Sequence, residues 1–153
     1  MLANARAKDL RLAAAESCTG GLVAGVLTEI PGSSEVFERG WVTYSNAAKT
    51  DELGAPAELI EELGAVSAPV AQAMAEGALA RSMADIVVAI TGVAGPDGAS
   101  PEKPVGLVWF GIARHRVPAR TLERRYGDLG RAGIRLAAVA TALDLLGEEI
   151  ERI

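Results

Sequence analysis

The chain has 153 residues, of which half are apolar and 23% are charged, and its formal net charge is −5. A chain of this length favours one domain, here over residues 1–153, and the acidic balance lacks the basic face of a nucleic-acid-binding protein, so we expect no nucleic-acid partner. One cysteine, an N-terminus without an apolar leader and apolar runs shorter than the roughly 20 residues of a membrane span predict a cytoplasmic protein with no disulfide and no membrane segment.

The N-terminal part of the chain is predicted to alternate helices and strands. A mostly apolar run at 10–16 ends in a polar cluster and two glycines, a pattern typical of a strand, a tight turn and a helix. Ser45 is a good N-cap for a helix that ends at Gly54. The predicted elements are a helix at 2–7, a strand at 10–16, a helix at 19–30, a helical turn at 33–37, a strand at 40–44 and helices at 46–53, 56–63 and 67–83.

The C-terminal part is predicted to contain three strands and a closing helix. The strand at 85–90 is apolar throughout after Asp85, which indicates that both of its faces are covered. A long irregular loop with three glycines and three prolines follows at 92–104. Strands at 105–113 and 120–126 form a hairpin before a helix at 131–150. These elements predict a three-layer α/β/α sandwich with a mixed, mostly parallel sheet of about five strands.

Three loops are expected to meet at one end of this sheet. Ligands bind outside the carboxyl ends of parallel strands, where residues 16–21, 44–49 and 91–104 leave the sheet. The first loop places Ser17, Cys18 and Thr19 directly before the first amides of a helix. Those amides have no partner inside the helix, and the helix dipole favours negative charge beside them. If the chain has an active site, we expect it at this turn.

The residue types present argue against three common kinds of active site. The single histidine, His115, lies in a predicted hairpin turn between Arg114 and Arg116, which argues against a Ser-His-Asp triad. One histidine and one cysteine do not supply the ligands of a zinc site, so we expect no metal. Leu22 follows the two glycines where a P-loop would have Lys and Ser or Thr, so the pattern does not fit a P-loop.

A serine nucleophile with a lysine base needs no histidine. Ser17 is the candidate nucleophile, and Lys49 is the candidate base if its pKa falls from about 10.4 to roughly 7–8. Tyr44 is expected to relay a proton or to hold the lysine. The amides near Thr19 and Gly20 are expected to stabilise an oxyanion.

Spacing alone leaves a structural alternative open for each of these residues. The alternatives are a helix cap for Ser17 or Thr19, core packing for Cys18, a solvated charge for Lys49, a half-buried strand position for Tyr44, a simple connector for residues 91–104 and a solvated stripe for Arg131 and Arg135.

Five motifs in one order give the chain a resemblance to a known family. They are Ala15-Glu16-Ser17-Cys18-Thr19-Gly20-Gly21, Thr43-Tyr44-Ser45-Asn46 with Lys49, Gly64-Ala65-Val66-Ser67, Thr91-Gly92-Val93-Ala94-Gly95-Pro96-Asp97-Gly98 and Lys103-Pro104-Val105-Gly106-Leu107-Val108. Together they resemble the CinA C-terminal domain family, which includes nicotinamide mononucleotide deamidases. Nearly the whole chain takes part in this resemblance.

The resemblance implies an amidohydrolase of pyridine-nucleotide salvage, which converts nicotinamide mononucleotide and water to nicotinate mononucleotide and ammonia without a cofactor. It implies Ser17 as nucleophile, Lys49 as base and Tyr44 as an active-site tyrosine. The residues expected to contact the substrate are Thr19, Gly20, Asn46, Thr91, Gly92, Gly95 and Arg131. A non-catalytic nucleotide-binding module and an amidase for another small substrate are the competing hypotheses. Low aromatic content, apolar helices and a short N-terminal segment predict a homo-oligomer.

Overall fold

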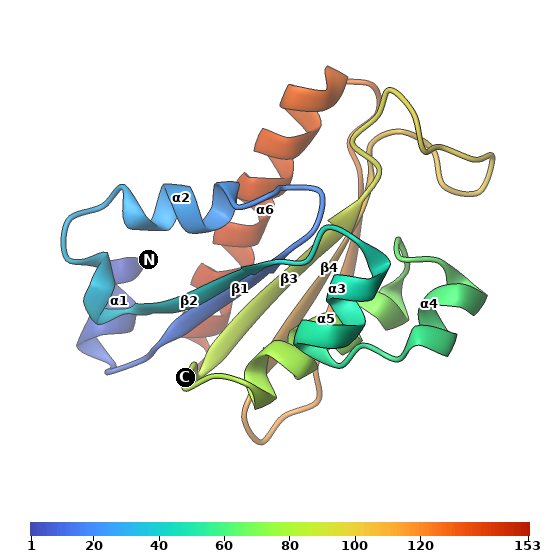
Figure 1. The fold of residues 1–153 in the computed structure, drawn as a ribbon. Helices are drawn as coiled ribbons and strands as arrows, with labels where there is room; N and C mark the ends of the chain where they lie inside the picture. The colour runs from blue at the N-terminus through green and yellow to red at the C-terminus, as the bar shows by residue number, and fades with distance from the viewer.

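A five-stranded sheet lies at the centre of the computed structural model, which describes all residues 1–153. Its order is β2-β1-β3-β4-β5 (Figure 1). The strands are β1 (Leu12–Glu16), β2 (Phe37–Val42), β3 (Ile86–Gly92), β4 (Leu107–Arg114) and β5 (Arg120–Arg125). β1 pairs in parallel with β2 and β3, whereas β4 is antiparallel to β3 and β5. Only β4 runs against the other strands, so the predicted mixed, mostly parallel sheet is confirmed.

Helices cover both faces of the sheet (Figure 1). One layer consists of α1 (Leu2–Ala7), α2 (Leu22–Thr28) and the long α6 (Gly130–Glu151), with a 3-10 turn at Ser33–Glu35 beside it. The other layer consists of α3 (Asn46–Leu53), α4 (Ala57–Leu63) and α5 (Ala68–Ala80). None of these helices combines the length and hydrophobicity needed to cross a membrane. The predicted three-layer α/β/α sandwich is therefore confirmed.

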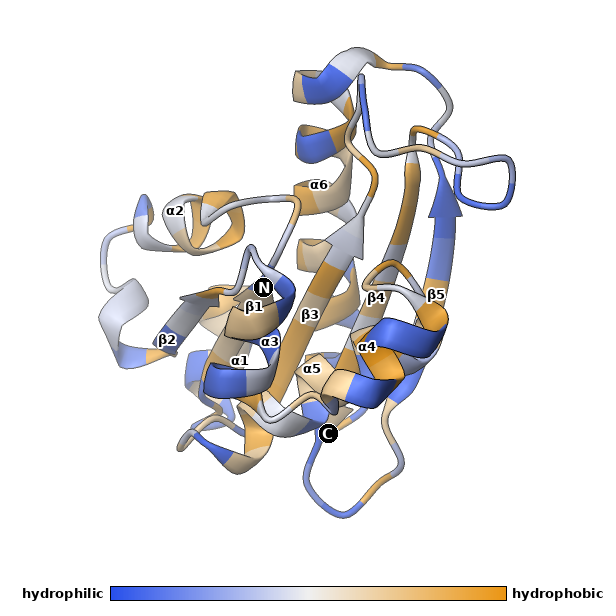
Figure 2. Ribbon diagram, turned by 45° about the vertical axis from the view of Figure 1, so that its right-hand side comes forward, coloured by the Kyte–Doolittle hydropathy of each residue, from blue (hydrophilic) through white to orange (hydrophobic).

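Successive residues of each strand face the two helical layers in turn. On β1, Leu12 and Ala14 belong to the core under α2 and α6, whereas Ala13 and Ala15 belong to the core under α5. In Figure 2 the central strands β3 and β4 are mostly apolar, while the edge strand β5 is largely hydrophilic. Small residues let α5 lie close to the sheet, because a Cβ on Gly111 would lie only 2.2 Å from the Ala71 carbonyl oxygen.

Helix propensity favours alanine over glycine in α5, but at Gly77 we expect alanine to lower the stability of the protein. A Cβ there would lie 1.8 Å from the Leu53 carbonyl oxygen, so Gly77→Ala is expected to destabilise the protein by about 1–3 kcal/mol. Gly147 of α6 is the matched control, since a Cβ on it would meet no atom within 4 Å. There, alanine is expected to stabilise by about 0.5–1 kcal/mol. Urea unfolding measures both, and equal effects would contradict this packing.

Three predicted boundaries are wrong, each for a local reason. The strand predicted at 40–44 is β2 at Phe37–Val42, because its pairing with β1 ends at Val42 opposite Glu16. The helix predicted from residue 19 begins at Leu22, because Gly20 and Gly21 have φ of 61° and 97°. The strand predicted from residue 105 begins at Leu107, because Gly106 has φ of 91°. The bounds predicted for the other elements lie within three residues of the observed ones.

Candidate active site

A pocket of about 230 Å³ opens at the carboxyl ends of β1 and β3. Five parts of the chain meet there: the turn after β1, the end of the β2–α3 connection with the start of α3, the segment between α4 and α5, the long loop after β3 and the start of α6. The lining residues are Ser17, Cys18, Tyr44, Asn46, Lys49, Ala65, Val66, Thr91, Gly92, Val93, Ala94, Gly95, Asp97, Gly98 and Arg131. The three loops expected to converge on one cleft therefore do so.

Ser17 and Lys49 meet inside this pocket. Ser17 follows β1 directly, and its N–H donates to the Ile90 carbonyl of β3 at 2.9 Å. Lys49 lies one turn into α3, which Ser45 caps by accepting a hydrogen bond from the Ala48 N–H at 3.0 Å. The distance from Lys49 Nζ to Ser17 Oγ is 2.9 Å. A base must lie within about 3 Å of the proton-bearing atom or reach it through one water, and this pair meets the condition directly.

Burial shifts the amine of Lys49 toward its neutral form. The side chain is 1% exposed, and burial lowers the pKa of the amine from 10.5 to about 8. Its Nζ donates to the carbonyl oxygens of Thr43 at 2.7 Å, Tyr44 at 3.2 Å and Ser45 at 3.4 Å. In its neutral form the amine can donate to two of these three carbonyls at a time, and its one lone pair can accept the Ser17 hydroxyl proton. The alternative of a solvated surface charge is therefore wrong.

Glu16 corrects the expectation for the helix start after β1. Its fully buried carboxylate accepts hydrogen bonds from the N–H groups of Gly21 at 3.0 Å, Val23 at 3.1 Å and Ala24 at 2.9 Å. The negative charge favoured by the start of α2 therefore comes from the chain itself, and neither Ser17 nor Thr19 caps this helix. The one carboxylate in an otherwise apolar strand was the available sequence signal.

Cys18 lines the pocket next to Ser17, but its environment opposes thiolate formation. Burial raises the pKa of the Cys18 thiol to about 11. A nucleophilic cysteine needs its pKa lowered by nearby positive charge or by a base, and here desolvation outweighs the charges of Lys49 and Arg135. This agrees with the sequence interpretation of Cys18 as a packing residue.

Tyr44 and Arg131 meet at the rim of the pocket. Tyr44 lies beyond the end of β2 and is 61% exposed, so the alternative of a half-buried strand residue is wrong. Its hydroxyl accepts a hydrogen bond from Arg131 Nη2 at 3.1 Å, and Arg131 Nη1 donates to the Gly95 carbonyl at 2.8 Å. Tyr44 holds Lys49 through its backbone carbonyl rather than through its hydroxyl.

The other residues expected to contact the substrate fall into two groups. Asn46, Thr91, Gly92 and Gly95 line the pocket, and the Thr91 hydroxyl donates to the Ala65 carbonyl at 2.9 Å. Thr19 and Gly20 are not among the lining residues. The Thr19 residue is fully buried, and a Cβ on Gly20 would lie 3.2 Å from Arg135.

Arg135 contacts the turn that carries Ser17, although the sequence offered only a solvated stripe on a helix as its alternative role. From α6 its Nε donates to the Cys18 carbonyl and its Nη2 to the Thr19 carbonyl, both at 3.0 Å. Its position four residues after Arg131 placed both on one helical face, but nothing local indicated which atoms it would bind.

The sequence profile of the CinA C-terminal domain matches residues 1–150. The chain belongs to the CinA C-terminal domain family.

Curated relatives of this CinA domain include both short and long proteins. It is 49% identical over 145 residues to the nicotinamide-nucleotide amidohydrolase PncC of Escherichia coli K12, covering 94% of this chain and 87% of that one. It is 57% identical over 114 residues to a CinA-like protein of Akkermansia muciniphila, covering 74% of this chain and 28% of that one. The chain spans only about a third of the length of several such relatives, for example 34% of a putative competence-damage inducible protein from Symbiobacterium thermophilum.

Solved structures share the fold of this CinA domain. The competence/damage inducible protein CihA from Agrobacterium tumefaciens superposes with a TM-score of 0.93 at 52% identity, covering 95% of this chain and 88% of that one. A CinA superfamily protein from Escherichia coli has a TM-score of 0.89 at 35% identity, covering 94% of this chain and 83% of that one.

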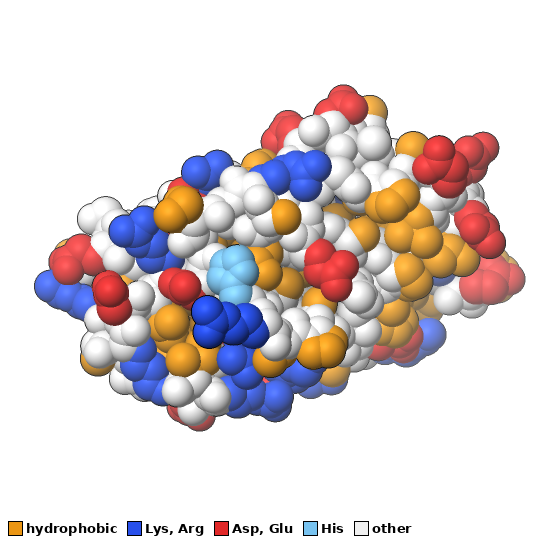
Figure 3. Space-filling view, turned by 90° about the horizontal axis from the view of Figure 1, so that it is seen from below, with side chains coloured by type: hydrophobic (Ala, Val, Ile, Leu, Met, Phe, Trp, Pro, Cys, Tyr) orange, Lys and Arg blue, Asp and Glu red, His pale blue; other side chains and the backbone are white.

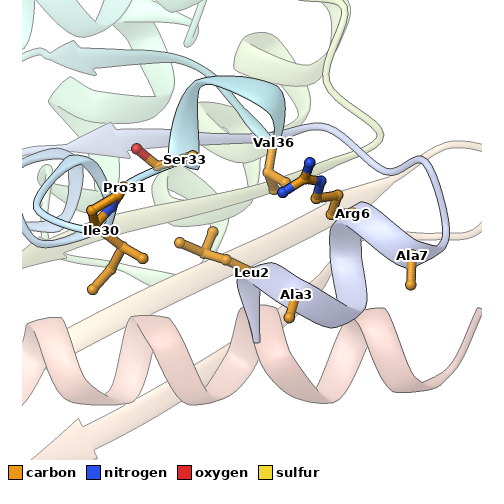
Figure 4. Close-up of a pocket in the computed structure, with 9 residues that line it drawn as sticks. Leu2, Ala3, Arg6, Ala7, Ile30, Pro31, Ser33 and Val36 are labelled. Carbon is orange, nitrogen blue, oxygen red and sulfur yellow. The ribbon is translucent and has the colours of Figure 1, made fainter.

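Two other features of this CinA domain lie away from the pocket. His115 is exposed in the turn between β4 and β5, on the face seen in Figure 3, at the far end of the sheet from the pocket. A larger cavity of about 500 Å³ lies between α1 and the segment after α2 (Figure 4). Its one charged lining residue, Arg6, is paired with Glu35 at 2.9 Å. This cavity holds no base beside a nucleophile, whereas the pocket of about 230 Å³ holds both Ser17 and Lys49.

Proposed function

We propose that the chain is an amidohydrolase that converts nicotinamide mononucleotide and water to nicotinate mononucleotide and ammonia. The observation behind this proposal is the buried contact of 2.9 Å between Ser17 Oγ and Lys49 Nζ. The lowered pKa of Lys49, about 8, supports its role as a base. The name of the Escherichia coli relative, nicotinamide-nucleotide amidohydrolase, supports the substrate.

The first half of the reaction forms an ester on Ser17. Neutral Lys49 accepts the hydroxyl proton as Ser17 Oγ attacks the carboxamide carbon, which gives a tetrahedral oxyanion. The new ammonium of Lys49 is stabilised by the carbonyls of Thr43, Tyr44 and Ser45. It then donates a proton to the leaving nitrogen, the carbon–nitrogen bond breaks, and ammonia departs.

The second half regenerates the serine. Lys49 accepts a proton from a water molecule that attacks the ester carbonyl carbon, and a second tetrahedral oxyanion forms. When this intermediate collapses, the bond to Ser17 Oγ breaks and Lys49 returns the proton to that oxygen. The product is nicotinate mononucleotide, and the sum of both halves consumes one water and releases one ammonia.

The rim of the pocket suits the phosphate of the nucleotide. Arg131 is exposed there and uses two of its five N–H donors on Tyr44 and Gly95, which leaves three for an anion. The pocket volume of about 230 Å³ is below the roughly 300–1,000 Å³ of typical ligand sites, so a bound nucleotide would extend over this rim. Asn46 and the backbone at Gly92 and Gly95 would contact the rest of the substrate.

Ammonia release from nicotinamide mononucleotide by the purified chain tests the proposal. Stoichiometric release of ammonia and nicotinate mononucleotide is expected. Calorimetric binding of the nucleotide without turnover would instead favour the non-catalytic nucleotide-binding module. Release of ammonia only from other members of a panel of pyridine nucleotides and small amides would keep the chemistry and change the substrate. The cytoplasmic location and the homo-oligomeric state stay predictions from the sequence.

A further inference from the structure

Three successive carbonyl groups of the turn at 17–20, those of Ser17, Cys18 and Thr19, accept hydrogen bonds. Ser17 O accepts a hydrogen bond from the Gly20 N–H at 3.1 Å. Cys18 O and Thr19 O accept from the same Arg135 guanidinium, each at 3.0 Å, and Thr19 O also accepts from the Leu22 N–H at 3.2 Å. Arg135 is therefore the only side chain that fixes the orientation of these carbonyls.

The amide of Cys18 is in the opposite situation. Its N–H donates to no acceptor in the chain, although Cys18 is only 7% exposed and lines the pocket next to Ser17. Farther along the turn, the Gly20 N–H donates to the Ser17 carbonyl and the Gly21 N–H donates to Glu16. The Thr19 N–H also has no acceptor, but Thr19 is fully buried and does not line the pocket. An unpaired backbone N–H in a buried position is rare, and beside a nucleophile it suits a developing oxyanion.

The two observations are connected by peptide geometry. In a trans peptide the C=O and N–H groups point in opposite directions. Because Ser17 O is turned into the 17–20 turn, the Cys18 N–H must point out of it. The bond from Arg135 to the Cys18 carbonyl fixes the direction of the next peptide in the same way, so it opposes a rotation that would change the shape of the turn beside Ser17.

We propose that Arg135 is a positioning residue of the reaction, which holds the 17–20 turn so that Ser17 Oγ meets Lys49 and the Cys18 N–H donates to the oxyanion. The inference rests on the proposed hydrolysis for its kinetic consequence. Arg135 itself touches neither the substrate nor the reacting atoms. Its bonds to Cys18 and Thr19 link α6 to a turn more than a hundred residues earlier in the chain.

Arg135→Gln and Arg135→Lys separate this role from a purely structural one. Loss of an oxyanion donor costs about 10²–10³-fold in kcat, so a misoriented donor in Arg135→Gln is expected to lower kcat by about 10–100-fold, with KM changed less than about threefold. Arg135→Lys is expected to recover part of kcat, because one ammonium can bind one carbonyl but lacks the fork that binds two. Arg152→Gln, at the far end of α6, is the matched control and should match the wild type.

Labelling of Ser17 by a fluorophosphonate gives a readout independent of the substrate. Ser17 Oγ displaces fluoride at phosphorus, and the phosphoryl oxygen takes the oxyanion position, so Arg135→Gln should slow labelling by a similar factor at an unchanged urea midpoint. Wild-type kcat and labelling rate in Arg135→Gln would overturn the inference, as would losses that only follow the unfolded fraction, or a wild-type Ser17 that does not react. A wild type that is labelled but does not hydrolyse nicotinamide mononucleotide would refute the proposed function instead, and the labelling rates would still decide the role of Arg135.

Discussion

Replacing Ser17 with alanine is expected to reduce ammonia release from nicotinamide mononucleotide by at least about 10³-fold, because the acyl-transfer route loses its nucleophile. Ser17 Oγ is the atom that Lys49 Nζ contacts at 2.9 Å, and the neighbouring Cys18 thiol, with a pKa near 11, cannot replace it at neutral pH. Steady-state assay of ammonia with purified protein measures the loss.

Two controls make this result specific to the nucleophile. Ser34→Ala changes an exposed serine in the 3-10 turn and should retain wild-type turnover. Ser17→Ala itself should bind nicotinate mononucleotide with nearly wild-type affinity, since the substrate contacts proposed at the rim are unchanged. Ammonia release above about a tenth of the wild-type rate in Ser17→Ala would refute the covalent mechanism.

Lys49 gives the second large effect, and two substitutions probe different properties of it. Lys49→Met removes the base and should lower kcat by at least about 10³-fold. Lys49→Arg keeps a positive charge but cannot become neutral in the accessible pH range, so it should lose activity to a similar extent. A role limited to charge or packing would instead leave Lys49→Arg largely active.

Lys8→Met is the matched control for these variants. Lys8 also donates its Nζ to a backbone carbonyl, that of Ile150 at 2.9 Å, but at the opposite end of α6 from Arg131. It should turn over like the wild type. Urea unfolding of each variant shows whether a loss of ammonia release reflects the missing base or a loss of folded protein.

The sequence predicted the layers better than the ends of the elements. Apolar runs and helical spacing were sufficient for five strands and the two helical layers, because burial repeats with the period of each element. The strand predicted at 40–44 was displaced because its register is set by pairing with β1, which ends at Glu16 opposite Val42. Such pairing is a property of distant residues and has no local signal.

The residues of the candidate site also divide into those that the sequence could predict and those that it could not. Ser17, Lys49 and Tyr44 could be predicted because each lies at or just after the end of a predicted strand, where α/β proteins bind ligands. Glu16 and Arg135 could not be placed, because their roles depend on which amides and carbonyls the folded turn presents. Thr19 and Gly20 were predicted as oxyanion contacts because their amides begin a predicted helix, but Thr19 is fully buried, and the Gly20 N–H donates to the Ser17 carbonyl inside the turn.

The pH dependence of kcat/KM for wild-type ammonia release tests the central claim most directly, because it reports the ionisation of the free enzyme. Burial lowers the pKa of Lys49 from 10.5 to about 8, which raises its neutral fraction at pH 7 by roughly 300-fold. Only the neutral amine can act as the base, so kcat/KM should rise about tenfold per pH unit below this pKa and level off above it. A profile that is flat through pH 8, or that levels off only near the ordinary lysine pKa, would contradict a buried Lys49 base.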